Sequence, residues 1–127
     1  MNNSGCYRFR KEQHLRRPED FKKIYAQRNV SRQRGVTLFA AANDLPFTRI
    51  GLSVSRKNGN AVVRNRIKRL FREAFRRNQQ EIPPGLDLIL VPEKDRTLVL
   101  TELEESLRRG VQALARRLAR KSQPDSP

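Results

Sequence analysis

The chain has 127 residues and a formal net charge of +15 at pH 7, with 28 Lys and Arg against 13 Asp and Glu. This length favours one domain with a modest core, and the charge indicates a polyanionic partner, most commonly nucleic acid. No stretch approaches the roughly 18 to 20 apolar residues of a membrane-spanning helix, and the single cysteine, Cys6, excludes an intrachain disulfide and favours a reducing cytoplasm.

Residues 1–17 are predicted to form a flexible basic arm, because they are polar and show no periodicity. They contain no apolar run, so a secretory signal is not expected. Pro18 suits the first position of a helix, and Phe21, Ile24 and Tyr25 follow at i, i+3 and i+4 as one aromatic stripe. We expect one domain over residues 18–120 and a disordered polar tail over residues 121–127.

Strand patterns flank a more basic middle segment. Residues 29–35 are polar and basic and are predicted to form a loop, and residues 36–42 are predicted to form a strand. Residues 43–48 contain a proline and form the turn that follows. Residues 86–91 are predicted to form a short apolar strand, which a second proline ends.

Residues 49–55 alternate along the chain, which is typical of a strand with two different faces. Ile50, Leu52 and Val54 lie on one face, and Arg, Gly and Ser residues lie on the other. The small polar face either lets a polynucleotide backbone approach closely or simply faces water. Both interpretations remain open from the sequence.

The segment 56–77 is the most basic part of the chain. It holds nine Lys or Arg and one acid, more than half of the net charge in about a sixth of the length. Asn60 is a good N-cap for a helix, and Gly59 frees the backbone for a tight turn. Wound at about 100° per residue, the helix separates basic from apolar residues. The basic face carries Arg64, Asn65, Lys68, Arg69, Arg72 and Arg76, and the apolar face carries Val63, Ile67, Leu70, Phe71 and Ala74.

Like charges repeat on this basic face at Arg64, Lys68 and Arg72, one turn apart. Such neighbours destabilise an isolated helix, whereas a solvated helix face normally mixes the two signs. An external polyanion would compensate the repulsion. Asn65 lies among the cations, and its amide can both donate to and accept from a base edge, a sugar hydroxyl or a phosphate. The segment is therefore predicted to be a helix that lies on RNA.

A final amphipathic helix is predicted to begin with a capping box formed by Thr101 and Glu104. Its core stripe consists of Leu103, Leu107, Val111, Leu114 and Leu118. Together with the strand–helix–strand unit around the basic helix, this pattern predicts the α+β class, with helices packed on a small, mostly antiparallel sheet.

No catalytic group stands out. A nuclease acting alone needs a positioned acid or base, or a carboxylate cluster for a metal. His14 is the only histidine, and no Cys/His spacing suggests zinc. The acids at the start of the last helix fit dipole and capping roles, and neither a P-loop nor a nucleophile elbow is present. We expect no catalytic residue, no metal ligand and no bound cofactor on this chain.

A dense motif surrounds the start of the basic helix. It consists of Lys57, Gly59-Asn60-Ala61-Val62, Arg64-Asn65-Arg66, Lys68-Arg69 and Arg72-Glu73. This pattern resembles the signature of the bacterial ribonuclease P protein subunit, the partner of a catalytic RNA that removes the 5′ leader from precursor tRNA. The resemblance extends over most of the chain. It implies the order helix, two or three strands, helix, strand, helix, with a left-handed crossover that departs from the usual right-handed rule.

The resemblance also implies partners and binding sites. The partners would be the catalytic RNA, at about one protein per RNA, and precursor tRNA, with no obligate protein partner and no membrane. The active site and its magnesium ions would belong to the RNA. The expected RNA-binding residues are Arg56, Lys57, Asn60, Arg64, Asn65, Arg66, Lys68, Arg69 and Arg72.

Three aromatic residues form a second candidate site. From spacing alone, Phe21, Tyr25 and Phe39 are either ordinary core residues or stacking platforms for single-stranded bases. The resemblance implies that they line a cleft for the single-stranded leader of precursor tRNA.

Two other functions fit the charge and size of the chain. One is a structural ribosomal RNA-binding protein, and the other is a sequence-tolerant DNA-binding protein. A DNA reader usually presents a helix-turn-helix pair or a dimer seam, and neither is visible here. We therefore favour a cytoplasmic ribonuclease P protein.

Overall fold

The computed structural model describes residues 11–94 and 97–122. The helices are α1 (Pro18–Ala26), α2 (Ala61–Arg77) and α3 (Leu100–Ser122), and the strands are β1 (Val30–Gln33), β2 (Val36–Ala42), β3 (Arg49–Leu52) and β4 (Leu86–Pro92). Short 3-10 turns are η2 (Lys11–Gln13), η3 (Arg56–Asn58) and η4 (Gln79–Glu81). The predicted α+β class is confirmed. Within the described ranges, no helix is long and apolar enough to cross a membrane.

The four strands form one mixed sheet in the order β1-β2-β4-β3. β2 pairs antiparallel with both β1 and β4, whereas β3 pairs parallel with β4. The prediction of a mostly antiparallel sheet is therefore confirmed, and α2 is the crossover helix between the parallel neighbours. The left-handed sense of this crossover stays a prediction.

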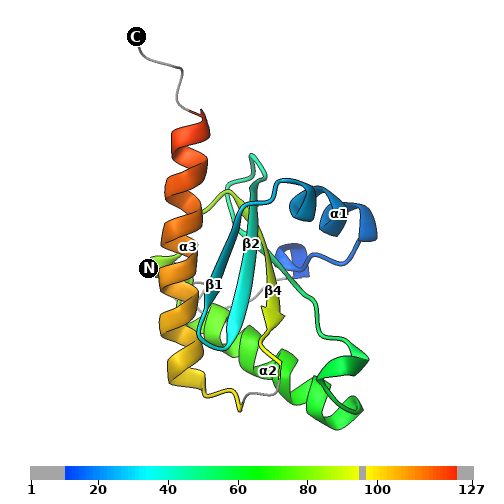
Figure 1. The fold of residues 1–127 in the computed structure, drawn as a ribbon. Helices are drawn as coiled ribbons and strands as arrows, with labels where there is room; N and C mark the ends of the chain where they lie inside the picture. Colours follow the sequence, from blue (N-terminus) through cyan, green and yellow to red (C-terminus); the bar gives the residue numbers. More distant parts are fainter. Residues whose placement is uncertain (1–10, 95–96, 123–127) are drawn as a thin grey trace.

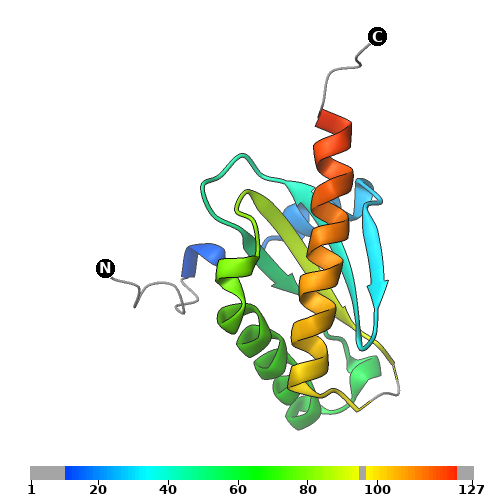
Figure 2. The same cartoon turned by 90° about the vertical axis from the view of Figure 1, so that its left-hand side faces the viewer.

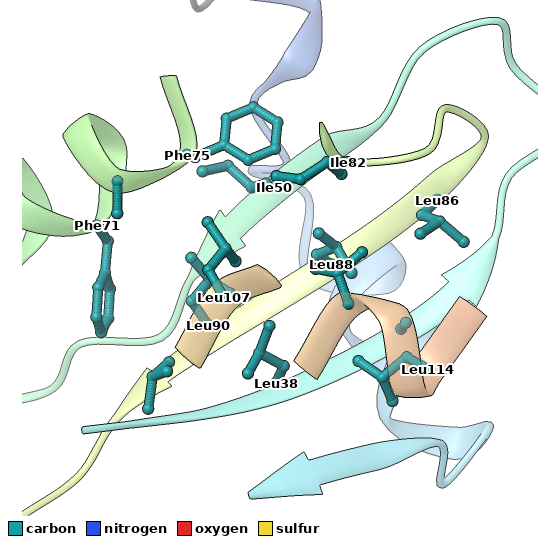
Figure 3. Packing of buried hydrophobic residues seen from close by; sticks show 14 of the residues in the cluster. Leu38, Ile50, Phe71, Phe75, Ile82, Leu86, Leu88, Leu90, Leu107 and Leu114 are labelled. Carbon is teal, nitrogen blue, oxygen red and sulfur yellow. The ribbon is translucent and has the colours of Figure 1, made fainter. Parts of the chain in front are cut away.

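The main core lies between the sheet and the two longer helices. α2 and α3 cover the same face of the sheet, with α3 running across it and α2 beside α3 (Figures 1 and 2). Alternate residues of β2 and β4 point into this core, where Leu38 and Leu88 are completely buried. Phe71 of α2 and Leu107 of α3 meet them from the helix side (Figure 3). Each such buried side chain contributes about 1.5–3 kcal/mol.

A smaller apolar cluster lies on the opposite face of the sheet, under α1 (Figure 1). Ile24 of α1 packs there against Ala41 of β2 and Ile89 of β4, together with Leu15 from the N-terminal segment. The helix spans only nine residues, so it covers part of this face and leaves the rest open. This uncovered part is where the molecule can present a sheet surface to a ligand.

Gly51 lies on this second face, and its position corrects one prediction. A Cβ atom at Gly51 would lie 2.5 Å from Cζ of Phe21, which shows that the ring sits directly on the backbone of β3. The small face of the strand therefore admits an aromatic side chain of the protein at this point. Neither a polynucleotide backbone nor water occupies the space above Gly51.

β1 is a strand that the sequence does not predict, because its residues lie inside the expected loop at 29–35. Its polar composition is explained by its place at the edge of the sheet, where it pairs with β2 alone. The strand is also tied to the last helix, since the guanidinium of Arg117 donates a hydrogen bond to the Val30 carbonyl. Pairing with the neighbouring strand β2 and the contact from α3 thus override a weak local strand preference.

Two element boundaries also differ from the predictions. β3 ends at Leu52 instead of residue 55, because Ser55 caps the following turn: its amide donates to Oδ1 of Asn58 at 2.9 Å and its hydroxyl accepts from the Lys57 amide at 3.3 Å. α3 begins at Leu100, so Thr101 lies inside the first turn and the predicted capping box is wrong.

Glu104 and Asn78 join the end of α2 to α3. The Asn78 amide donates to the Ala74 carbonyl at 2.7 Å and to the Glu104 carboxylate at 3.0 Å. Its oxygen accepts a hydrogen bond from Arg108 at 2.6 Å, and Arg77 pairs with Glu104 at 3.3 Å. Asn78 is only 4% exposed, so a buried amide with all of these partners holds the two helices in one relative position.

The predicted arm at residues 1–17 lies partly outside the described residues, as does Cys6. Its described part packs on the domain: Leu15 is 5% exposed, and its amide donates to the Ile50 carbonyl at 2.7 Å. His14 forms a parallel bridge with Ile50 at the edge of β3. The predicted tail at residues 121–127 also lies mostly outside the described residues, and α3 continues as far as Ser122.

Candidate nucleic-acid interface

The start of α2 is built by two adjacent turns. Oδ1 of Asn60 accepts a hydrogen bond from the Val63 amide at 3.0 Å, which confirms the predicted N-cap. Gly59 adopts a φ of +133°, and a Cβ there would lie 2.9 Å from the Val63 side chain. Both the conformation and the space therefore require glycine. The side-chain oxygen of Asn60 is thus already engaged in positioning the helix.

One side of α2 carries most of the predicted RNA-binding residues, and we call it the basic ridge. It consists of Arg64, Asn65, Lys68, Arg69 and Arg72. Asn65, Arg69 and Arg72 are exposed, while Arg64 and Lys68 are half-buried. In the described part of the chain, none of the four cations pairs with a carboxylate. The repulsion expected from the sequence is therefore present on the folded helix, without compensation from the protein itself.

The remaining predicted residues lie apart from the ridge. Lys57 and Arg66 line a cavity of about 300 Å³, whose other walls include Val63 and Leu98. Arg56 is exposed in the turn η3 that precedes the helix. The basic surface therefore continues around the first turns of α2 and is wider than one helix face.

The single acid of α2 is neutralised within the helix. Glu73 accepts a hydrogen bond from Nε of Arg76 at 3.1 Å. This bond lowers the pKa of Glu73 below its usual value and raises the pKa of Arg76. Since the two charges cancel at the C-terminal end, the ridge keeps a purely positive potential toward the N-terminal end.

Arg64 carries an unsatisfied group. Its Nε is buried and has no hydrogen-bond partner among the described residues. A buried donor left unpaired costs about 1–3 kcal/mol, and such groups are rare in folded proteins. An acceptor supplied by a bound molecule would remove this cost.

The three predicted aromatic residues come together on the face of the sheet under α1, and we call them the aromatic cluster. The rings of Tyr25 and Phe39 meet edge to face, with centroids 4.8 Å apart and an interplanar angle of 81°. Phe21 packs in the same apolar group as Phe39. Tyr25 is 36% exposed, and Phe21 and Phe39 are half-buried. Each ring is thus anchored in the small core while part of it stays accessible.

The same sheet face continues beyond the aromatic cluster along three strands. Phe39 lies opposite Ile89, and one pair further along Thr37 lies opposite both Arg32 of β1 and Val91 of β4. Directly opposed residues share a face. Thr37 and Val91 are half-buried, and Arg32 is exposed with no carboxylate partner in the described residues. Sequence reasoning missed Arg32, because the strand that positions it was predicted to be a loop.

The other end of this face is electrically neutral. Nε and Nη2 of Arg49 bond both oxygens of Asp87, at 2.8 and 2.7 Å. These hydrogen bonds raise the pKa of Arg49, and Asn43 donates to the same carboxylate at 2.9 Å. Arg49 is therefore a structural partner of β4, and the exposed Arg32 remains available on this face for an anionic ligand.

The described residues show no evident catalytic or metal-binding centre. In residues 11–94 and 97–122, no group of three His, Cys, Asp or Glu side chains is placed to hold a metal ion. The prediction that the chain carries no catalytic or metal-binding residue stays a prediction. What the described surface does offer is a charged helix and a separate aromatic cluster, both suited to nucleic acid.

Comparison with known proteins agrees with these surfaces. A family model described as Ribonuclease P matches residues 9–118. The "Ribonuclease P protein component" of Brevibacillus brevis is 38% identical over 95 residues, covering 73% of this chain and 75% of that protein. That of Thermotoga maritima is 39% identical over 87 residues, covering 68% and 74%.

Solved structures match the fold over a similar range. The RNase P protein from Thermotoga maritima gives a TM-score of 0.68 at 30% identity, covering 76% of this chain and 96% of that one. The RNase P protein of Staphylococcus aureus gives a TM-score of 0.69 at 30% identity, covering 81% and 94%. With the family model spanning nearly the whole domain, the chain belongs to the ribonuclease P protein family and is a protein component of this tRNA-processing ribonucleoprotein.

Proposed function

We propose that this ribonuclease P protein binds its catalytic RNA through the basic ridge of α2 and holds the single-stranded 5′ leader of precursor tRNA on the aromatic cluster. One structural observation supports the assignment of two RNA segments to two separate surfaces. The ridge and the cluster lie on different elements, on opposite sides of the sheet: α2 packs on one face and α1 on the other. One protein can therefore contact two RNA segments at once.

The ridge fits a structured RNA. Its four cations have no internal carboxylate partner, and the buried Nε of Arg64 lacks an acceptor in the described residues. Phosphate oxygens supply the missing negative charge and, once the Arg64 side chain turns outward, an acceptor for its Nε. Asn65 adds a neutral group that reads sugar or base atoms. We infer one protein per catalytic RNA, since the described residues present one such ridge.

The aromatic cluster fits a single strand. Half-buried rings offer flat surfaces on which unpaired bases stack without regard to sequence, worth about 1–3 kcal/mol per base. Arg32 lies further along the same face and would neutralise a backbone phosphate of the same strand. The 5′ leader of a precursor tRNA is single-stranded and varies in sequence, and both properties match this surface.

We infer that the active site and its magnesium ions belong to the RNA. The chain then contributes substrate binding and support of the RNA structure in a cytoplasmic complex. Purified protein free of RNA should leave precursor tRNA intact, and its addition to the cognate RNA at low magnesium should restore cleavage. Metal-dependent cleavage by a rigorously RNA-free preparation would contradict the assignment.

Two substitutions separate the surfaces in one experiment. Arg69→Ala should weaken assembly with the catalytic RNA about tenfold, whichever substrate is used, because it removes one phosphate contact. Phe39→Ala should leave assembly intact and weaken binding of leader-bearing precursor relative to mature tRNA by about 1–3 kcal/mol. Arg116→Ala, which removes an exposed charge from α3, is the matched control. Equal losses for precursor and mature tRNA in a folded Phe39→Ala protein would refute the cleft.

A further inference from the structure

A small cavity of about 210 Å³ opens where the N-terminal segment, the edge of β3 and α2 meet. Its lining residues are His14, Leu15, Arg16, Ile50, Leu52, Lys68 and Arg72. The apolar members belong to the two cores beneath it. The polar members are all cationic or can become so, and no carboxylate is among them.

The backbone fixes the polar groups around this cavity. The Leu15 amide bonds the Ile50 carbonyl, and the parallel bridge between His14 and Ile50 holds the segment along the free edge of β3. Gln13 anchors it further by donating to the Thr48 carbonyl at 3.3 Å. The side chain of His14 is therefore held at the cavity by hydrogen bonds of its neighbours.

α2 supplies the opposite wall. Lys68 and Arg72 are one helical turn apart, so their side chains lie on the same side of the helix. Figure 2 shows the N-terminal segment lying beside α2. Arg16 follows His14 in the chain and adds a third permanent positive charge. Three elements thus bring the charges of Arg16, Lys68 and Arg72 to one cavity.

Such a site has a strong positive potential, and His14 responds to it. Partial burial, followed by the charges of Arg16 and Arg72, lowers the pKa of His14 below its ordinary value. An anion in the cavity reverses both electrostatic causes, because it attracts the imidazolium and screens the guanidinium groups. Among the described residues that line the cavity, the charges beside His14 are Arg16 on its own segment and Lys68 and Arg72 on α2, while β3 contributes Ile50 and Leu52.

We propose that this cavity binds one phosphodiester group of an RNA strand, held by Arg16, Lys68 and Arg72 and by a His14 that takes up a proton on binding. The strand is assigned to the catalytic RNA, because Lys68 and Arg72 belong to the basic ridge; this step rests on the proposed function. The site is selective for oxyanions, since guanidinium groups bond phosphate or sulfate oxygens in pairs whereas chloride offers a single point of contact.

The direction of the pH dependence follows from linkage. The phosphate stabilises the imidazolium, so the pKa of His14 is higher in the complex than in the free protein. Binding therefore takes up a proton between the two pKa values, and the affinity rises as the pH falls through that range. Among the residue types that line the cavity, only histidine has an ordinary pKa between pH 5 and pH 8. The response thus belongs to His14 alone among the residues lining the cavity.

The first test uses the free protein with sulfate as the probe. The chain has one histidine, so its ring signals in an NMR titration report this cavity without ambiguity. Sulfate should raise the pKa of His14 above its value in chloride at matched ionic strength. Lys68→Gln and Arg72→Gln should each weaken the sulfate effect about tenfold, and Arg116→Gln, which removes an equal charge on α3, should leave it unchanged. An equal response to both anions, or an undiminished response in both cavity variants, would overturn the site.

The second test uses the catalytic RNA. The affinity of the natural protein should increase between pH 7.5 and pH 5.5 by a larger factor than that of His14→Gln, which keeps a polar side chain but cannot become charged. Circular dichroism of the variant checks that it is folded. Identical pH responses of the two proteins would overturn the assignment to RNA, and so would a His14-dependent response seen only when precursor tRNA binds.

The two tests fail in different ways. Sulfate binding at His14 needs no RNA, so it survives if the proposed function is wrong and the protein does not bind the catalytic RNA. Loss of the sulfate response while assembly with the catalytic RNA is normal removes only the phosphate site.

Discussion

Under the proposed function, the basic ridge and the aromatic cluster bind RNA in two physically different ways. The ridge belongs to one helix, its residues are neighbours in the sequence, and its attraction is electrostatic and acts over about a Debye length. The aromatic cluster joins α1 to β2, depends on the sheet for its geometry, and acts only at contact between ring and base. Electrostatic attraction by the ridge therefore needs little geometric precision. Stacking on the aromatic cluster, by contrast, needs each ring to be held at a defined position.

The largest expected difference is the response to salt. Raising the salt concentration from 50 to 200 mM should weaken assembly with the catalytic RNA by about 10³-fold, because several neutralised phosphates release counterions. The factor by which Phe39→Ala weakens binding of the leader should be the same at both salt concentrations, since stacking releases few ions. Filter binding at the two concentrations measures both effects. If assembly did not depend on salt, the ridge would not act electrostatically, and the two surfaces would not differ in this respect.

Gly51→Ala tests how strongly the aromatic cluster depends on its scaffold. The added Cβ would lie 2.5 Å from Cζ of Phe21, so the ring has to move away from β3. Strain of this kind costs about 1–3 kcal/mol, and it should reduce discrimination between precursor and mature tRNA. Assembly with the catalytic RNA should be nearly unchanged in the folded protein. Chemical denaturation and tRNA binding together measure the effect.

As a control for that substitution, Gly110→Ala creates a comparable clash in the main core, where a Cβ would lie 2.6 Å from Leu38. It should lower stability without a specific loss of leader binding. If both variants changed leader discrimination equally, the contact between Gly51 and Phe21 would have no special role.

Asn60→Ala removes the cap of α2 and should cost about 1 kcal/mol of stability. The frayed first turn carries Arg64 and Asn65 near its end, so assembly with the catalytic RNA should weaken while leader discrimination is kept. Asn60→Ser retains a capping oxygen and should restore both stability and assembly. If Asn60→Ser assembled as poorly as Asn60→Ala, the amide of Asn60 would be an RNA contact in its own right.

The smallest effect is expected for Glu73→Gln. The hydrogen bond from Arg76 lowers the pKa of Glu73 in the folded protein, so its contribution to stability is present above the ordinary Glu pKa and disappears as the pH falls through the lowered value. The melting temperature of the variant should be slightly below that of the natural protein at pH 7, and the difference should shrink as the pH falls below the ordinary Glu pKa. Loss of the negative charge should also strengthen RNA binding slightly. A difference in melting temperature that does not shrink with falling pH would have another cause.

The sequence predicts the ridge well because every signal for it is local. The cap at Asn60, the separation of faces along α2 and the repeated cations all lie within a few turns of one helix. The aromatic cluster was predicted in composition, but spacing alone left open whether its rings are core residues or platforms. In the structure each ring is partly packed in the small core and partly exposed, and only the register of the sheet shows this, since it determines how much of each ring α1 covers.

The misses have one physical origin, which is dependence on contacts with other elements of the fold. β1 is polar and becomes a strand through its pairing with β2, so Arg32 could not be assigned to a sheet face beforehand. Thr101 and Glu104 match a capping box, yet Glu104 bonds Asn78 and Arg77, which approach from α2. The segment around Leu15 lacks periodicity, and contacts with β3 and the preceding turn hold it: Leu15 is buried, its amide bonds Ile50, and Gln13 bonds Thr48.

The junction at Asn78 has a consequence for the order of events during synthesis. α2 emerges from the ribosome before β4 and α3, yet Phe71 and Phe75 are buried against those later elements. The amide of Asn78 likewise finds Glu104 and Arg108 only after α3 has been made. The apolar side of α2 therefore stays exposed until translation has passed about Leu114. During that interval nascent α2 is a basic segment with an uncovered apolar face. Under the proposed function, α2 therefore reaches its final form for the catalytic RNA only after α3 has been made.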